Sequence, residues 1–144
     1  MSIAKVLLVD DEASFLKIMS KRLSSRDVDV LTAESGAAGL EVLAENKSVD
    51  VVILDVKMPG MDGIEALHAI RTKFPLVEVV MLTGHATVET AIEGMKQGAY
   101  DYLMKPCDID KLIAVVAKAK EKKEVHEEKI LQAQLKEITT RMAG

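Results

Sequence analysis

Three carboxylates, a hydroxyl and an ammonium group lie at the ends of four short apolar runs in this sequence. In chain order they are Asp10 and Asp11, Asp55, Thr83, and Lys105. Several carboxylates gathered in one place repel one another and retain protons unless a cation neutralises them. Mg²⁺ suits such a place, because it prefers oxygen ligands and typically uses one or two carboxylates together with phosphate oxygens. These residue types therefore predict Mg²⁺-dependent phosphoryl chemistry, provided that the fold brings them together.

In that chemistry an aspartate can act as the nucleophile. A carboxylate such as Asp55 can form an aspartyl-phosphate, while the metal and a lysine offset the charge of the transferring group and Thr83 donates a hydrogen bond to it. Each residue also has a plain structural interpretation, since an aspartate after a strand is commonly a turn former or a helix cap. A functional site is favoured because all five groups lie at the ends of apolar runs.

Strands and helices are predicted to alternate along the whole chain. The apolar runs are too short for typical helices and predict five strands. The segments between them carry apolar residues at helical spacing, including Val88, Ala91, Ile92 and Met95 in the fourth such segment. The five strands are expected at Val6 to Val9, Val28 to Ala33, Val51 to Leu54, Val77 to Leu82, and Tyr100 to Met104.

Helix signals agree with this alternation. Asp62 with Glu65 is a candidate capping box, Asp108 can cap the last helix, and Gly98 can end the fourth helix in a left-handed turn. Such an alternation predicts an open, doubly wound α/β domain with a five-stranded parallel sheet and helices on both faces. The ends of parallel strands meet at one edge of a sheet, where ligands bind, so the five polar groups are expected to lie together.

Bulk properties narrow the class of protein. The chain has 144 residues, a net charge of -4 and a pI near 5.4. One domain is expected, without direct nucleic-acid binding, which usually needs clustered basic residues. No apolar run approaches the roughly 20 residues of a membrane span and no signal peptide is evident, so we expect a cytoplasmic protein without a membrane partner. The single cysteine, Cys107, is interpreted as a small buried hydrophobe.

Four motifs resemble those of one known family. The segments VLLVDDE, VVILDVKMPGMDG, VVMLTGHA and AYDYLMKP, at these spacings, are similar to the receiver domain of bacterial two-component response regulators. The resemblance covers residues 3 to about 120. It implies the strand order 2-1-3-4-5, which is known for chemotaxis regulators with this fold.

The resemblance also implies roles for individual residues. Asp55 falls on the phosphoacceptor, which takes its phosphoryl group from a sensor histidine kinase or a phosphotransfer protein. Asp11 falls on the carboxylate that binds Mg²⁺ directly, and Asp10 on the one that helps to place the ion. Lys57 is expected to offer its backbone carbonyl to the metal, and Lys105 to contact the phosphoryl oxygens.

Further positions are assigned by the same resemblance. Thr83 and Tyr102 match the pair that switches conformation, with Tyr102 turning inward after phosphorylation. Lys57 and His85 match positions that tune the rate of dephosphorylation, and the bond before Pro106 is expected to be cis. His85 as a metal ligand is a competing hypothesis, although no second His or Cys lies near it in sequence.

The chain continues beyond the expected receiver, which we place at residues 1–120. The extension, residues 121–144, belongs to a stretch from Asp108 to Ala143 without Gly or Pro, which predicts one helix of about 50 Å. Its middle, KAKEKKEVHEEK (118–129), is charged, whereas Leu131, Leu135, Ile138 and Met142 follow a 4-3-4 spacing. This spacing favours a dimerising helix over a solvated tail, with a phase shift near Val125.

The output of the switch is left open by the sequence. The chain either signals through an unknown output partner or is the regulatory part of a longer transcription regulator of the enhancer-binding type. Two other classes are less favoured. An aspartyl-phosphate phosphatase typically has a second aspartate where this chain has Lys57, and a non-phosphorylated structural receiver usually lacks one of the site residues. A dinucleotide-binding domain is disfavoured because Asp-Asp-Glu, and no glycine-rich loop, follows the first strand.

Overall fold

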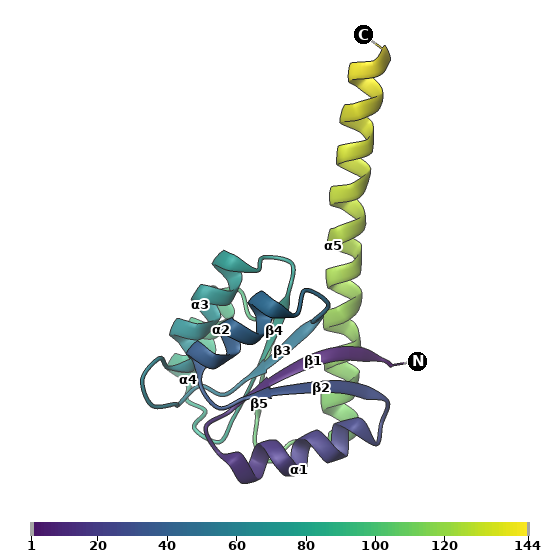
Figure 1. Cartoon of the computed structure of the whole chain (residues 1–144). Helices are drawn as coiled ribbons and strands as arrows, with labels where there is room; N and C mark the ends of the chain where they lie inside the picture. Colours follow the sequence, from purple (N-terminus) through teal and green to yellow (C-terminus); the bar gives the residue numbers. More distant parts are fainter. Residues whose placement is uncertain (1, 144) are drawn as a thin grey trace.

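Strands and helices alternate strictly in the computed structural model, which describes residues 2–143 (Figure 1). Every predicted element is present. The strand bounds differ from the apolar runs by at most two residues, because β1 starts at Ala4, β4 runs from Glu78 to Thr83, and β5 starts at Asp101. The elements are β1 (Ala4–Val9), α1 (Ala13–Ser24), β2 (Val28–Ala33), α2 (Gly36–Glu45), β3 (Val51–Leu54), α3 (Gly63–Lys73), β4 (Glu78–Thr83), α4 (Val88–Lys96), β5 (Asp101–Met104) and α5 (Ile109–Ala143).

The five strands form one parallel sheet in the order β2-β1-β3-β4-β5, as the resemblance implied. The residues of β3 and β4 are buried throughout, and those of β1 nearly so. This burial explains why these strands read as continuous apolar runs, since helices cover both faces of such a sheet.

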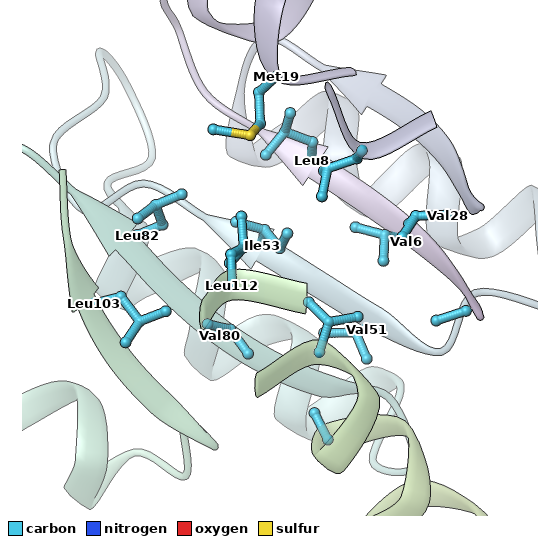
Figure 2. Close-up of a cluster of buried hydrophobic side chains, with 14 of the residues drawn as sticks. Val6, Leu8, Met19, Val28, Val51, Ile53, Val80, Leu82, Leu103 and Leu112 are labelled. Carbon is cyan, nitrogen blue, oxygen red and sulfur yellow. The ribbon is translucent and has the colours of Figure 1, made fainter. Parts of the chain in front are cut away.

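Two hydrophobic cores flank the sheet, and alternate residues of each strand contribute to them. Leu8 and Ile53 face the core beneath α1 and α5, whereas Leu7 and Leu54 face the core beneath α2 and α3. Figure 2 shows the first core, in which Met19 comes from α1 and Leu112 from α5. Burying each such side chain contributes about 1.5–3 kcal/mol, so the two faces together hold the strand ends in place.

Local caps define where the helices begin and end. The Asp62 carboxylate accepts a hydrogen bond of 2.9 Å from the Glu65 backbone N–H. Asp108 accepts one from the Asp110 N–H at 3.2 Å. Gly98 has a φ of +98°, the left-handed conformation expected after α4. All three positions match the sequence predictions, although Asp62 forms only its own half of the predicted capping box with Glu65.

The apolar stripe of α4 does not face a core, although the sequence pattern correctly predicts the helix. Val88 is 76% exposed, Ile92 51% and Met95 48%. Gly94 is the buried residue of the helix, and it packs toward the Tyr102 ring. An apolar stripe at helical spacing usually faces the core, but here α4 turns it outward and leaves an unpartnered surface.

Helix α5 binds the sheet over its first four turns and then leaves it (Figure 1). Its sheet-facing residues follow one stripe that ends at Lys123, whose ammonium donates to Asp50 at 3.0 Å. Lys120 donates to the Ile3 carbonyl at 3.0 Å, and Lys122 lies 3.8 Å from the buried Glu78 carboxylate. These three lysines reach the starts of β1, β3 and β4, so part of the charged 118–129 segment is docked on the domain.

Every residue of α5 from 124 to 143 is exposed. Leu131 lies eight residues after Lys123, which places it about 80° around the helix axis from the sheet-facing stripe at 3.6 residues per turn. The sheet-facing stripe that ends at Lys123 and the seam of residues 131–142 therefore lie on different sides of one continuous helix. Among residues 2–143, no helix combines the length and the apolar character needed to cross a membrane.

Candidate functional site

Backbone pairing beyond the strand ends brings the predicted site residues to one edge of the sheet. Asp10 donates its N–H to the Ala33 carbonyl at 3.1 Å, and Asp55 donates to Val9 at 3.0 Å. Lys105 donates in the same way to Thr83, at 2.9 Å. These bonds fix the residue after each strand relative to the neighbouring strand.

The three aspartates form a compact group of oxygen ligands. One carboxylate oxygen from each of Asp10, Asp11 and Asp55 lies within 4.8 Å of the other two. Asp10 and Asp55 are buried, whereas Asp11 is exposed. This donor set fits a hard divalent cation such as Mg²⁺, which prefers oxygen ligands and keeps several waters, and the exposed Asp11 leaves room for those waters.

Burial raises the pKa of Asp55 above its usual value, and the charge of Asp10 acts in the same direction. The Thr83 hydroxyl, the Lys105 ammonium and the Val56 N–H lower the pKa in part. The Val56 N–H donates to Asp55 Oδ1 at 2.8 Å. A charged Asp55 is therefore unfavourable by itself, and a bound cation would favour the ionised form that a nucleophile needs.

Lys105 is held beside the aspartate cluster by two carboxylates. Its Nζ lies 2.6 Å from Asp10 Oδ2 and 3.8 Å from Glu12 Oε1. The other oxygen of Asp10 accepts the Glu12 backbone N–H at 2.9 Å. The Lys105–Pro106 peptide bond is cis. The ammonium thus pairs with the Asp10 carboxylate, and it lies near enough to Asp55 for its charge to lower the pKa of that carboxyl.

The loop between β3 and α3 folds back tightly on the backbone of Asp55. Gly63 donates its N–H to the Val56 carbonyl at 2.6 Å. A Cβ at Gly63 would lie 2.6 Å from the Val56 Cα and would overlap the Asp55 carbonyl oxygen. Only glycine fits here, because neither neighbour is a flexible side chain that could move away.

Thr83 and the two positions expected to tune dephosphorylation lie beside one another. The buried Thr83 accepts the His85 backbone N–H on its side-chain oxygen at 3.0 Å. Lys57 and His85, both exposed, line one hollow of about 440 Å³ together with Thr87 and Thr90. This hollow is where water would approach the β3 and β4 loops.

Other predicted residues lie away from the aspartates. Tyr102 packs beside α4, where its hydroxyl contacts Thr90. Leu131, Leu135 and Ile138 are exposed on the distal part of α5. Cys107 is half-buried against the core beneath α1 and α5, and not fully buried as predicted, and its partial burial raises the pKa of its thiol.

Two contacts were missed from the sequence. Thr87 and Thr90 form a reciprocal capping box at the start of α4, which the Thr-x-x-Thr spacing could have indicated. The Phe15 ring lies against Lys105, 90 positions along the chain, and no periodic signal links the two residues.

Comparisons with known proteins agree with this geometry. The family model of the response regulator receiver domain matches residues 6–117. The DNA-binding transcriptional regulator NtrC of Escherichia coli is 40% identical over 114 residues, which are 79% of this chain and 24% of that protein. A putative NtrX-like response regulator of Rickettsia bellii is 39% identical over 132 residues, or 90% of this chain and 27% of that protein. The chain thus spans about a quarter of the length of these curated relatives.

Solved structures show the same fold. A response regulator receiver domain protein from Clostridium thermocellum superposes with a TM-score of 0.81 at 39% identity, covering 85% of this chain and 98% of that one. NtrX from Brucella abortus superposes with a TM-score of 0.80 at 32% identity, covering 89% of this chain and 29% of that one.

Proposed function

Because the chain belongs to the family of response regulator receiver domains, we propose that Asp55 accepts a phosphoryl group from a sensor histidine kinase or a phosphotransfer protein. The observation that supports this most directly is the grouping of the Asp10, Asp11 and Asp55 carboxylates beside Lys105. Asp55 is buried and follows β3, the middle strand of the sheet, which supports its assignment as the nucleophile.

In the proposed transfer, an Asp55 carboxylate oxygen attacks the phosphorus of the donor's phosphohistidine. A P–O bond forms as the donor's P–N bond breaks, and the electron pair of that bond stays on the imidazole nitrogen. Asp10 and Asp11, with the Lys57 backbone carbonyl, would hold Mg²⁺, which offsets negative charge on the transferring group. Lys105 stabilises the phosphoryl oxygens, and Thr83 donates its hydroxyl to one of them.

The switch would then reach the outer surface of α4 and β5. Thr83 turning toward the phosphoryl group and Tyr102 turning inward would change the packing next to Gly94. Val88, Ile92, Met95 and Met104 are exposed around this region, and an apolar surface of this kind is typical of a protein interaction site. Phosphorylation can change this surface only by stabilising one of two existing conformations of the domain more than the other.

The output partner is proposed to lie outside this chain. The matched segments are only 24% and 27% of these two relatives, which supports a receiver that regulates a longer transcription regulator. The exposed 131–142 seam supports a homodimer through α5. In this proposal the only reactions are phosphorylation of Asp55 from a donor and its hydrolysis, without turnover of an outside substrate.

Labelling with a phosphoryl donor tests the proposal. The wild-type protein should gain one acid-labile, hydroxylamine-sensitive phosphoryl group in the presence of Mg²⁺, as measured by intact mass. Asp55→Asn should abolish the labelling, whereas Asp29→Asn, at an exposed position of β2, should retain it. Stoichiometric labelling of the Asp55→Asn protein would refute the assignment.

A further inference from the structure

Phe15, in the first turn of α1, lies directly against the Lys105 ammonium. The Lys105 Nζ is 3.9 Å from the centroid of the ring. Two other lysines lie over aromatic rings, Lys47 over Phe74 and Lys122 over Tyr100, but at 5.5 and 5.8 Å. At the shorter distance the ammonium touches the ring face, where the attraction of the aromatic quadrupole for a cation is largest.

The ring occupies one side of an ammonium group that has few other contacts. A lysine ammonium carries three N–H donors. One donates to Asp10 at 2.6 Å, and the ring covers a second direction. The Lys105 side chain is 15% exposed. A third donor is therefore left for a phosphoryl oxygen, and the ring limits the directions in which the ammonium can move.

The ring contact differs from the Asp10 contact in what can compete with it. A divalent cation at the aspartates would attract the same Asp10 carboxylate that now holds Lys105. The Phe15 face offers no ligand to such a cation, because Mg²⁺ prefers oxygen. When a cation is bound, the ring contact would still hold the ammonium, together with the longer ion pair to the exposed Glu12 at 3.8 Å.

We propose that Phe15 is a positioning residue for Lys105, which keeps the ammonium directed at the phosphoryl group through the electron-rich face of its ring. This inference rests on the proposed function, because it concerns the same phosphoryl site. The alternative is that Phe15 only packs against the core beneath α1, with which its ring is also in contact. The two interpretations differ in whether the electrons of the ring matter or only its shape.

A double-mutant cycle separates these interpretations. The probe is beryllofluoride, a phosphoryl mimic, titrated in the presence of Mg²⁺. Phe15→Leu keeps an apolar side chain without a ring and should weaken binding roughly two- to fivefold, the range of a cation–π contact at a partly exposed site. Phe15→Tyr keeps the ring and should restore the affinity. In a Lys105→Met background, Phe15→Leu should have no further effect.

A fluorinated series keeps the test independent of any loss of packing. Replacing Phe15 by 4-fluoro-, 3,5-difluoro- and pentafluorophenylalanine preserves the ring while its face becomes progressively less negative. Affinity for beryllofluoride should fall along the series in the Lys105 protein and should stay constant along it in the Lys105→Met background. Equal affinity along the series, or an equal loss from Phe15→Leu with and without Lys105, would overturn the inference. Absence of binding by the wild-type protein would instead contradict the proposed function itself.

Discussion

The phenolic oxygen of Tyr102, on β5, lies 2.7 Å from the side-chain oxygen of Thr90 in the first turn of α4. The Thr90 oxygen also accepts the Thr87 backbone N–H at 3.1 Å, as half of the capping box. With one lone pair used by that bond, the Thr90 oxygen can still accept the Tyr102 proton. The proposed switch residue is therefore tied to the start of α4, and an inward turn would have to break this bond.

Removing this hydrogen bond should favour the switched state. Thr90→Val and Tyr102→Phe should each tighten beryllofluoride binding by roughly two- to tenfold, the range of one ordinary hydrogen bond. The double variant should show little more than either single change, because both remove the same bond. Thr72→Val, in α3, is a suitable control, since Thr72 also donates within its own helix. Fully additive effects in the titration would show that the two hydroxyls act separately.

Asp55→Asn should stabilise the protein by about 1–2 kcal/mol at neutral pH without metal, because it removes an unfavourable buried charge. The folded-state pKa of Asp55 is raised, so the folded protein binds this proton more tightly than the unfolded chain. The cost of the charge is complete above the raised pKa, and it disappears as the pH falls below the ordinary value of 3.8. Urea unfolding at several pH values should therefore show the gap between variant and wild type closing in acid. A gap that widens toward low pH would contradict the sign of this pKa shift.

Mg²⁺ should stabilise the folded protein, since it would neutralise carboxylates that repel one another. The expected gain is about 1.4 kcal/mol when free Mg²⁺ is ten times its dissociation constant. Asp11→Asn should remove most of this gain, whereas Asp29→Asn should keep it. Thermal unfolding across a Mg²⁺ titration measures both. Equal stabilisation of all three proteins would indicate a different metal site.

Lys123→Gln should lower the free energy of unfolding by about 1–3 kcal/mol, because it leaves the Asp50 carboxylate without its ion-pair partner. Lys129→Gln, six residues further along α5, lies on the exposed part of the helix and should change stability by less than about 0.5 kcal/mol. Urea unfolding of the two variants provides a matched comparison. Equal effects would show that the Lys123 contact does not contribute.

The distal seam of α5 should control any dimer. Leu135→Glu and Ile138→Glu place charges on the seam and should raise the dimer dissociation constant at least tenfold in sedimentation velocity. Thr140→Glu introduces the same charge on the opposite side of the helix and should have little effect. Truncation after residue 127, which keeps the Lys123–Asp50 pair, should leave a monomer. Identical sedimentation of all these proteins would remove the seam from the interface.

The order of strands and helices could be predicted from the sequence, and so could the grouping of the polar site residues at the strand ends, for the same reason. Strands buried on both faces are apolar along their whole length, so a polar residue such as Asp55 marks where the strand ends. Once the strands are parallel, their ends share one edge. The positions of Asp10, Asp55 and Lys105 followed from this without any knowledge of their side-chain contacts.

The remaining features depend on which part of the folded protein each side of a helix contacts. The spacing of apolar residues along the chain does not carry this information. The spacing of Val88, Ile92 and Met95 shows that they share one side of a helix, but it cannot show that this side stays exposed. Lys123 lies in a charged run that is typical of a solvent-exposed helix. It is buried because its ammonium donates to Asp50, 73 positions earlier. The contact between Phe15 and Lys105 is likewise a product of the folded chain.

The close approach of Gly63 to Asp55 also has a genetic consequence. Every amino acid other than glycine adds at least a Cβ, so any missense change in this codon pushes on the backbone of Asp55, the proposed phosphoacceptor. A random screen for loss of phosphoryl labelling should therefore recover position 63 in many allelic forms. Such alleles would leave every acidic side chain of the site intact.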